Sequence, residues 1–313
     1  MAGVFPDSLV LEAPAKVNLC LAVQWPPQDG YHALDSVFAT LDLHDTLTFS
    51  WGAPEDFAQN GVPQAQTKLG TTVRLDCGSL QLAVEKNLIF RAIDAAEQAC
   101  SLAAAPQGGA LSIAVEKHIP AGGGLGGGSS DAACALKAFA QVNDLDTLDE
   151  RLLSVAQQLG ADVAFFLYGG TALMNGRGDT LARRLPTFPL PLVLMGDDQG
   201  NSTAAVYALF DEEHPEAPDA YALTEAIEDE TCPRERLAHL CQNNLGPAAC
   251  QLGPRLSSRL ERAQADADVL NALVTGSGST SYAICADESK AARFAQRIAS
   301  QCAWTCVARC TEA

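Results

Sequence analysis

The chain has 313 residues, of which 48% are hydrophobic and 19% charged, so it is long enough to bury one large core or two ordinary ones. Its formal net charge of −18 argues against nonspecific binding to nucleic acid or to an anionic membrane, because both carry negative charge. We see no transmembrane run and no secretory signal, and we therefore expect a cytoplasmic protein. Eleven cysteines in such a chain predict free thiols in a reducing compartment.

The first half of the chain alternates predicted strands and helices. Residues 15–23 alternate, with Val17 and Leu19 on one face and Lys16, Asn18 and Cys20 on the other, which is typical of a strand. Turn residues follow at 26–30, and residues 52–72 are polar and predict an elaborated hairpin. Further strands are expected over 41–51, 74–79 and 109–120, and helices from near Asn87, over 130–142 and over 146–160.

The second half begins with an apolar segment over 161–185 that turns back as a hairpin. Three prolines between 186 and 191 then predict a domain boundary near residue 187, dividing the chain into domains 1–187 and 188–313. A strand follows the prolines, and the acidic stretch 211–236 predicts solvated loop and helix surface. Residues 269–287 are expected to contain a helix end, a glycine turn and a strand, before a closing helix over 288–301.

Cys302, Cys306 and Cys310 are spaced four apart, which places them on one face of a helix or a strand. This pattern could mark a metal site. Since no CxxC and no nearby histidine accompany it, we expect buried small side chains instead.

The segment "AGGGLGGGSSDAA", residues 121–133, concentrates glycines immediately before a predicted helix. A flexible linker would not usually join a strand directly to a helix. Gly122, Gly124 and Gly127 satisfy the dinucleotide pattern GxGxxG, but any glycine run does so, and a second helix follows where a Rossmann unit needs a strand. A Walker A loop is excluded because no Gly-Lys-Ser/Thr follows.

The remaining interpretation is a phosphate-binding loop. Glycines let backbone N–H groups approach an anion closely, and a helix N-terminus adds positive charge. We expect the helix to begin at Ser129 or Ser130, whose hydroxyls would cap it or meet a phosphate or metal ion. Asp131 also favours a helix N-terminus, and we assign it a capping role and no catalytic one.

Three segments resemble the three motifs of the GHMP kinase superfamily, which includes galactokinase, homoserine kinase and mevalonate kinase. They are "APAKVNLCLAV", "IPAGGGLGGGSSDAA" and "VTGSGSTSYA", in this order. Within the superfamily, "DGYHALDSVF", "EKNLIFRA" and "LGADVAFFL" are similar to the branch that acts on 4-diphosphocytidyl-2-C-methyl-D-erythritol. The resemblance extends from about residue 9 to residue 300.

This resemblance implies a two-domain α+β fold, with an N-terminal ATP-binding domain, a C-terminal ferredoxin-like domain and the active site in the cleft between them. It implies ATP and Mg²⁺, and transfer of the γ-phosphoryl group to the 2-hydroxyl of 4-diphosphocytidyl-2-C-methyl-D-erythritol in the non-mevalonate route to isoprenoid precursors. Glycines, one lysine and one carboxylate can suffice for this chemistry, because phosphoryl transfer depends mostly on positioning and charge neutralisation. The sequence assigns no ligand for Mg²⁺.

Two catalytic residues follow from the resemblance. Asp162 matches the catalytic base and would accept the proton of the substrate hydroxyl, although by composition alone it could equally cap a short helix. Lys16 matches the lysine of the first motif and would pair with Asp162 and stabilise charge on the phosphoryl group. Its alternative is a strand-end lysine that reaches solvent. Asn18 lies on the same strand face as Lys16 and could orient the substrate hydroxyl or the catalytic base. Near Asp162, Ala164 stands where the family usually has proline.

The resemblance also assigns binding residues. For the substrate these are Tyr31 and His32, which would stack on and hydrogen-bond a cytosine, together with Tyr207, Gly276 and Gly278. For ATP they are Asn87, Lys117, Pro120, Gly122, Gly123, Gly124, Leu125, Gly126, Gly127, Gly128, Ser129 and Ser130. Three positions depart from the family or lie beside a departure. Thr280 stands where proline or a small apolar residue is common. Asn244 matches an asparagine of the family, and Gly246 replaces the glutamate of the same stretch.

Three rival functions stay open at this point. Another kinase of the superfamily, acting on homoserine or a mevalonate derivative, is disfavoured by the "DGYH" segment, which fits a nucleobase pocket. A nucleotide-binding regulator without catalysis would predict loss of Lys16 or Asp162, yet both are present. An NAD oxidoreductase is disfavoured by the order of elements after the glycines.

Overall fold

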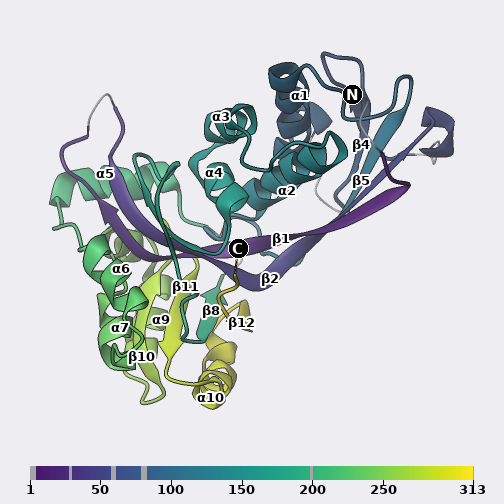
Figure 1. Ribbon diagram of the computed structural model, residues 1–313. Coiled ribbons are helices and arrows are strands. Elements are labelled where there is room, and N and C mark those ends of the chain that lie inside the picture. The colour runs from purple at the N-terminus through teal and green to yellow at the C-terminus, as the bar shows by residue number, and fades with distance from the viewer. Residues whose placement is uncertain (1–4, 28–29, 58–60, 79–82, 198–199, 313) are drawn as a thin grey trace. The chain divides into compact units, whose positions relative to one another are not determined.

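The computed structural model describes residues 5–27, 30–57, 61–78, 83–197 and 200–312 (Figure 1). Parts of the predicted turn at 26–30, of the hairpin over 52–72 and of the strand over 74–79 therefore lie outside the described residues. The chain forms two compact units, each assembled from separate stretches. Unit 1 comprises residues 1–14, 44–119 and 127–168, and unit 2 comprises residues 15–43, 120–126 and 169–313. These units are a different division from the sequence domains predicted to meet near residue 187, and that boundary stays a prediction.

Unit 1 combines part of a sheet with four helices. The strands follow the order β3 (Gln64–Gln66), β4 (Thr72–Asp76), β5 (Ala110–Glu116) and the second part of β2 (Leu34–Gly52). β4 and β5 are parallel, and β5 pairs antiparallel with β2 from Thr46–Glu116 to Gly52–Ala110. The helices α1 (Leu88–Cys100), α2 (Gly127–Val142), α3 (Glu150–Leu159) and α4 (Ala161–Tyr168) pack against one another beside these strands (Figure 1).

Capping residues define where two of these helices begin. Asn87 precedes α1 and its side chain accepts from Ile89 N at 2.9 Å, while Asp149 precedes α3 and accepts from Arg151 N at 2.9 Å. Both helices were predicted, and their N-caps satisfy N–H groups that have no partner within the helix. The α2 prediction was wrong at its start, because the helix begins at Gly127 and Ser129 lies inside its first turn instead of capping it.

Unit 2 contains two sheets. In the first, β9 (Gln242–Asn243) pairs parallel with β1 (Ser8–Val23), β1 neighbours β2, and β2 pairs with β6 (Thr171–Asn175). β7 (Thr180–Leu185) closes the hairpin with β6 that the sequence predicted. Residues 15–23 of β1 are all buried, so the strand carries its polar side chains Lys16 and Asn18 into the interior and does not present them to solvent.

The second sheet has the order β10 (Val269–Val274), β11 (Ser281–Cys285), β8 (Leu192–Gly196), β12 (Trp304–Ala308), with every neighbouring pair antiparallel. Helix α9 (Pro254–Gln264) precedes β10, and α10 (Glu288–Ile298) joins β11 to β12. This topology confirms the ferredoxin-like arrangement expected for the C-terminal part. The helix end expected at 269–274 was wrong. That segment is a short apolar run, which periodicity alone cannot distinguish from a strand.

Shorter elements complete the described chain. They are η1 (Pro54–Phe57), η2 (Val84–Lys86), α5 (Thr203–Glu213), α6 (Ala220–Glu228), α7 (Arg234–Leu240), α8 (Gly246–Leu252) and η3 (Ala299–Gln301). Helices α5 and α6 lie in or next to the acidic stretch 211–236.

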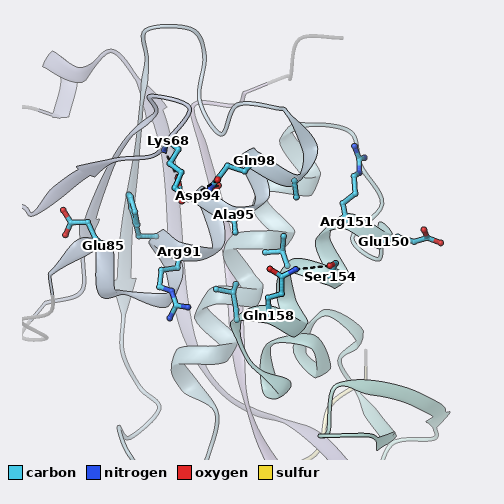
Figure 2. Close-up of a pocket in the computed structure, with 14 residues that line it drawn as sticks. Lys68, Glu85, Arg91, Asp94, Ala95, Gln98, Glu150, Arg151, Ser154 and Gln158 are labelled. Carbon is cyan, nitrogen blue, oxygen red and sulfur yellow. Dashed lines mark hydrogen bonds and ion pairs between the residues drawn. The ribbon is translucent and has the colours of Figure 1, made fainter. Parts of the chain in front are cut away.

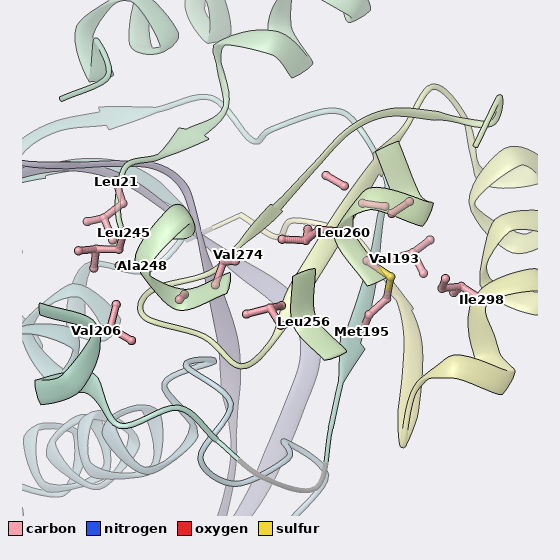
Figure 3. Close-up of a cluster of buried hydrophobic side chains, with 14 of the residues drawn as sticks. Leu21, Val193, Met195, Val206, Leu245, Ala248, Leu256, Leu260, Val274 and Ile298 are labelled. Atoms are coloured by element: carbon pink, nitrogen blue, oxygen red, sulfur yellow. The ribbon is translucent and has the colours of Figure 1, made fainter. Parts of the chain in front are cut away.

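A hydrophobic cluster in unit 2 packs helices against the second sheet. Leu256 and Leu260 of α9 lie beside Val193 and Met195 of β8 (Figure 3). Buried residues of β1, α5, α8, β10 and α10 extend the same cluster. Burial of each large aliphatic side chain contributes about 1.5–3 kcal/mol. The cluster therefore holds the sheet that carries the segment 274–283 resembling the third motif.

All eleven cysteines are free thiols. Cys306 lies in β12 and Cys302 follows η3. Cys302, Cys306 and Cys310 are all partly exposed, so the expectation that they are buried small side chains was wrong. Within the described part of the chain, no group of three or more His, Cys, Asp or Glu side chains is arranged to hold a metal ion. Nor does this part contain a helix that is both long and apolar enough to cross a membrane.

Two glycines of unit 2 give a matched test of this packing. A Cβ added at Gly196 would overlap the indole ring of Trp304, whereas one added at Gly246 would meet no atom within 4 Å. We expect Gly196→Ala to lower the free energy of unfolding by about 1–3 kcal/mol through overpacking. Gly246→Ala should leave it unchanged or raise it by up to about 1 kcal/mol, since alanine has less freedom in the unfolded chain. Urea denaturation of both variants measures this, and equal losses would contradict it.

Candidate active site

Lys16 and Asn18 form the centre of a buried polar network in unit 2. Lys16 is only 3% exposed, and its Nζ donates to Asn18 Oδ1 at 2.9 Å. The aromatic ring of Phe38 lies 5.1 Å from the same Nζ. These contacts rule out the alternative of a strand-end lysine that reaches solvent. A charged ammonium is costly to bury, so its place on β1 needs the neighbouring polar groups.

Asn18 connects this lysine to the turn between β10 and β11. Its Oδ1 also accepts from Gly276 N at 3.1 Å and from Thr275 Oγ1 at 3.3 Å. Its Nδ2 donates to Ser36 Oγ at 2.9 Å, so both ends of the amide are engaged. The side chain therefore has one fixed orientation, which places the Lys16 ammonium beside the backbone of Gly276.

Asn243 was not singled out from the sequence, yet it supports the same turn. Its Nδ2 donates to Val274 O and to Gly276 O, each at 2.8 Å. The neighbouring Asn244 holds β1 instead, because its side chain bonds both N and O of Val23 at 2.9 Å. The double asparagine of "NNLG" was the available signal, but only the fold assigns each amide a partner.

The glycines at 122–126 adopt conformations that other residues avoid. Gly122, Gly124 and Gly126 have φ values of 75°, 79° and 75°, in the left-handed region. A Cβ added at Gly124 would lie 3.0 Å from Thr275 O. The loop is also tied to β1, since Lys16 N donates to Leu125 O at 2.9 Å. These glycines thus permit both a tight backbone path and close approach to the β10–β11 turn.

Thr280 accounts for the absence of a side chain at Gly123. A Cβ at Gly123 would overlap Thr280 Oγ1, and Thr280 N donates to Gly123 O at 3.3 Å. Thr280 is buried, and its hydroxyl has no hydrogen-bond partner among the residues that the structure describes. The departure from the family pattern at this position therefore fills space against the glycine loop.

Lys117 lies between two aspartates in unit 1. Its Nζ contacts Asp45 Oδ2 and also Asp131 Oδ2, the latter at 2.7 Å. Burial lowers the pKa of Lys117, but the two carboxylates raise it further, so the net pKa lies above its usual value. Asp45 is fully buried and also accepts from His118 N and Ile119 N at 2.6 and 2.8 Å. It thereby fixes the end of β5, just before the glycine stretch.

The predicted capping role of Asp131 was wrong. It was expected to cap α2, but it lies in the fifth position of that helix and pairs with Lys117. Burial raises the pKa of Asp131 to about 6, against the lowering effect of Lys117. Its Oδ1 and the Ser130 hydroxyl are both buried without a hydrogen-bond partner in the described part of the chain. Two consecutive residues near the start of α2 thus each carry a buried oxygen atom without a hydrogen-bond partner among the described residues.

Asp162 lies in the first turn of α4, in unit 1, and is partly buried. The helix begins one residue earlier, at Ala161, so Asp162 is not the residue that precedes and caps it. Ala164, where the family usually has proline, is fully buried within the same helix. Proline is tolerated in the first turn of a helix, so either residue is compatible with the start of α4.

His32 and Tyr207, which the resemblance assigned to cytosine binding, lie side by side in unit 2. Their ring centroids are 5.5 Å apart, and the His32 ring also meets Phe210 edge-on at 5.4 Å. Nδ1 of His32 lies 2.8 Å from Gln24 O, and Nε2 lies 2.9 Å from Asp211 Oδ1. Both ring nitrogens are thus engaged, and the imidazole fastens the loop after β1 to α5.

Four exposed aromatic or basic groups lie near this histidine. Tyr31 is 61% exposed, and the Arg177 guanidinium lies 5.2 Å from its ring centroid. Trp25 is 45% exposed, and its ring centroid lies 3.9 Å from that of His214, at the C-terminal end of α5. Neither Trp25 nor His214 was predicted. Exposed aromatic rings beside a loop are a recognisable signal only after the fold has brought them together.

Unit 1 contains a pocket of about 970 Å³ between α1 and α3 (Figure 2). Arg91, Asp94 and Gln98 line it from α1, and Ser154 and Gln158 from α3. The lining mixes both signs of charge and includes none of the predicted site residues.

Family models and solved structures match this chain in sequence and fold. The family models "GHMP kinases N terminal domain" and "GHMP kinases C terminal" match residues 87–170 and 233–303. A solved structure of a 4-(cytidine 5'-diphospho)-2C-methyl-D-erythritol kinase superposes with a TM-score of 0.73 at 29% identity, covering 97% of this chain and 100% of that one. A homoserine kinase from Cytophaga hutchinsonii, at 19% identity and a TM-score of 0.69, shares the fold.

Curated relatives are more similar in sequence. The 4-diphosphocytidyl-2-C-methyl-D-erythritol kinase of Pelotomaculum thermopropionicum is 35% identical over 294 residues, covering 91% of this chain and 92% of its own. The enzyme of the same name from Thermobifida fusca is 37% identical over 317 residues, covering 97% and 96%. This chain therefore belongs to the 4-diphosphocytidyl-2-C-methyl-D-erythritol kinase family of GHMP kinases.

Proposed function

We propose that this protein transfers the γ-phosphoryl group of ATP to the 2-hydroxyl of 4-diphosphocytidyl-2-C-methyl-D-erythritol, in the non-mevalonate route to isoprenoid precursors. The observation that carries the proposal is the Lys16–Asn18–Gly276 network, because it joins two of the three motif segments through a buried lysine. We place the reaction in the cytoplasm, where eleven free thiols are stable.

Asp162 and Lys16 carry the chemistry in this proposal. The substrate oxygen forms a bond to the γ-phosphorus while the bond from that phosphorus to the β–γ bridging oxygen breaks, and ADP leaves. The Asp162 carboxylate accepts the hydroxyl proton, and the Lys16 ammonium stabilises negative charge on the phosphoryl oxygens. Asn18 is a positioning residue, since it holds Lys16 in one orientation.

The glycine stretch binds the phosphates of ATP. Glycines 122–126 expose backbone N–H groups along a path that side chains would block, and α2 begins directly after them, at Gly127. A helix N-terminus and converging N–H groups attract anions without any added cation. By resemblance to the family, Asn87 and Lys117 would contact the adenosine side of ATP. In a chain of net charge −18, such local positive potential is what an anionic ligand requires.

The residues at the start of α2 also fit Mg²⁺. Ser130 Oγ and Asp131 Oδ1 are buried oxygens without a hydrogen-bond partner in the described chain. Mg²⁺ prefers oxygen ligands and is commonly bound by one or two carboxylates together with substrate phosphates. Ser130 and Asp131 would hold the ion beside the phosphates, and the ion would supply neutralisation of their charge.

The aromatic residues of unit 2 recognise the cytidine. Tyr31 and Tyr207 offer ring faces for stacking, and His32 orders the loop that carries Tyr31 by its contacts to Gln24 and Asp211. Trp25 adds a further exposed ring on the same loop. Stacking of a base on an aromatic side chain contributes about 1–3 kcal/mol. This cluster supports a nucleobase-bearing substrate over homoserine or mevalonate derivatives, which have no ring to stack.

Substitution of Asp162 tests its role as the catalytic base. Asp162→Asn should lower kcat for substrate-dependent ADP release by about 10²-fold or more, with ATP binding retained, because the amide cannot accept the hydroxyl proton. Glu150→Gln provides the control, since Glu150 is an exposed acid in the first turn of α3. Full activity of Asp162→Asn would remove this residue from the mechanism. No turnover by the unmodified protein, with homoserine and mevalonate assayed in parallel, would reject the substrate.

Substitution of Trp25 tests its role in binding the nucleobase. Trp25→Ala should raise KM for the cytidine substrate about fivefold or more while leaving KM for ATP within about twofold, because only the nucleobase loses a stacking surface. Tyr221→Ala is the matched control, since Tyr221 is an exposed aromatic on α6, outside the cluster. Steady-state kinetics with each substrate varied in turn would measure both constants. An unchanged KM for the cytidine substrate would exclude Trp25 from recognition.

A further inference from the structure

A second pocket, of about 660 Å³, lies in unit 2 along α9. Arg255, Ser258, Arg259 and Arg262 occupy positions i, i+3, i+4 and i+7 of that helix and thus share one face. Ser300, Gln301 and Cys302 line the pocket around η3. None of these residues belongs to the network of Lys16 and Asn18 or to the aromatic cluster around His32.

The charge of this pocket is opposite to that of the protein. Among the residues that the structure describes, three arginines line it against a single acidic residue, Asp197, although the chain has 38 acidic and only 20 basic side chains. Asp197 is itself neutralised, because its Oδ2 accepts from Arg259 Nη1 at 2.7 Å. The lining therefore retains an excess of positive charge from Arg255 and Arg262.

Arg255 and Arg262 differ from the arginines that form ion pairs in this protein. Arg151, Arg293 and Arg297, for example, each pair with an aspartate at 2.6–2.8 Å. For Arg255 and Arg262, the described residues offer no carboxylate within ion-pair distance, and both side chains are exposed. Two guanidinium groups are thus available on one wall of the pocket. A guanidinium presents several N–H donors in a planar fork that matches phosphate oxygens.

Arg259 gives the pocket a rigid floor. It is 2% exposed, and its guanidinium donates to Ser279 O at 2.8 Å and, through Nε, to Ser281 Oγ at 3.0 Å. These bonds and the ion pair with Asp197 fix its position between α9 and the start of β11. Arg259 therefore holds this wall of the pocket in place, and Ser258 and Ser300 add hydroxyl groups to the lining.

We propose that the Arg255–Arg262 pocket is a binding site for a small phosphate-bearing anion, with free diphosphate as the chemical class that fits two guanidinium groups on one face of a helix. The site is separate from the glycine stretch, and the inference does not depend on the proposed kinase reaction. Occupancy would stabilise unit 2 by mass action, because the pocket exists only in the folded state.

Isothermal titration calorimetry with inorganic diphosphate tests the proposal. The titration is made in magnesium-free buffer with saturating ADP, so that the proposed nucleotide site is already occupied. We expect the unmodified protein to bind one diphosphate, and Arg255→Gln/Arg262→Gln to bind it at least tenfold more weakly. Arg236→Gln is the matched control, because Arg236 is an exposed arginine of α7, outside the pocket, and it should bind as the unmodified protein does.

Thiol labelling gives an independent readout. Cys302 lines the pocket and is partly exposed, whereas Cys232 has similar exposure but lies outside it. Diphosphate should slow alkylation of Cys302, measured by peptide mass spectrometry, and leave Cys232 unaffected. Absence of binding in the presence of ADP would overturn the proposal. Equal weakening by Arg236→Gln would also overturn it, as would slowing of both cysteines or of neither.

Discussion

The amide oxygen of Asn18 is the point on which the arrangement of unit 2 depends. It accepts hydrogen bonds from the Lys16 ammonium, from Gly276 N and from the Thr275 hydroxyl. A buried ammonium without such a partner would cost several kcal/mol. One side chain therefore satisfies the lysine and fixes the β10–β11 turn against β1, and the remaining features of the site are built around this contact. The other end of the same amide, bonded to Ser36, removes the freedom to rotate.

Close backbone approach is the second constraint, and it explains the glycines more fully than phosphate binding alone. Gly123 has no room for a side chain beside Thr280, and Gly124 has little room beside Thr275 O. The same absence of Cβ atoms that lets the loop pack against the β10–β11 turn also exposes its N–H groups. Packing and anion binding are thus served by one set of residues. A substitution there would disturb both at once, so loss of activity at these glycines would not by itself identify a ligand contact.

Positively charged side chains are few in this protein, and three of them are buried or partly buried beside hydrogen-bond acceptors. Lys16 is buried beside Asn18, Lys117 lies between Asp45 and Asp131, and Arg259 is held by Asp197. In each case an acceptor orients the cation and limits its movement. Pre-ordered cations are effective toward phosphate because no reorganisation is needed when the ligand arrives. Arg255 and Arg262 are the contrast, because their guanidinium groups have no ion-pair partner among the described residues and their exposed side chains can adapt to a small anion.

The sequence by itself determined the alternating strands and helices, the glycine loop before a helix and the identity of the family, because these depend on local periodicity and on short motifs. It placed Lys16 and Asn18 on one face of a strand correctly, since that follows from a period of two. The start of α2, the strand at 269–274 and the partners of Asp131 were decided only by the tertiary structure. For Asp131 and for residues 269–274 local preference was balanced, and pairing with another segment settled the outcome: Lys117 for Asp131, and the antiparallel partner β11 for residues 269–274. Trp25 and His214 show the same limit, because residues 189 positions apart become neighbours only when the chain folds.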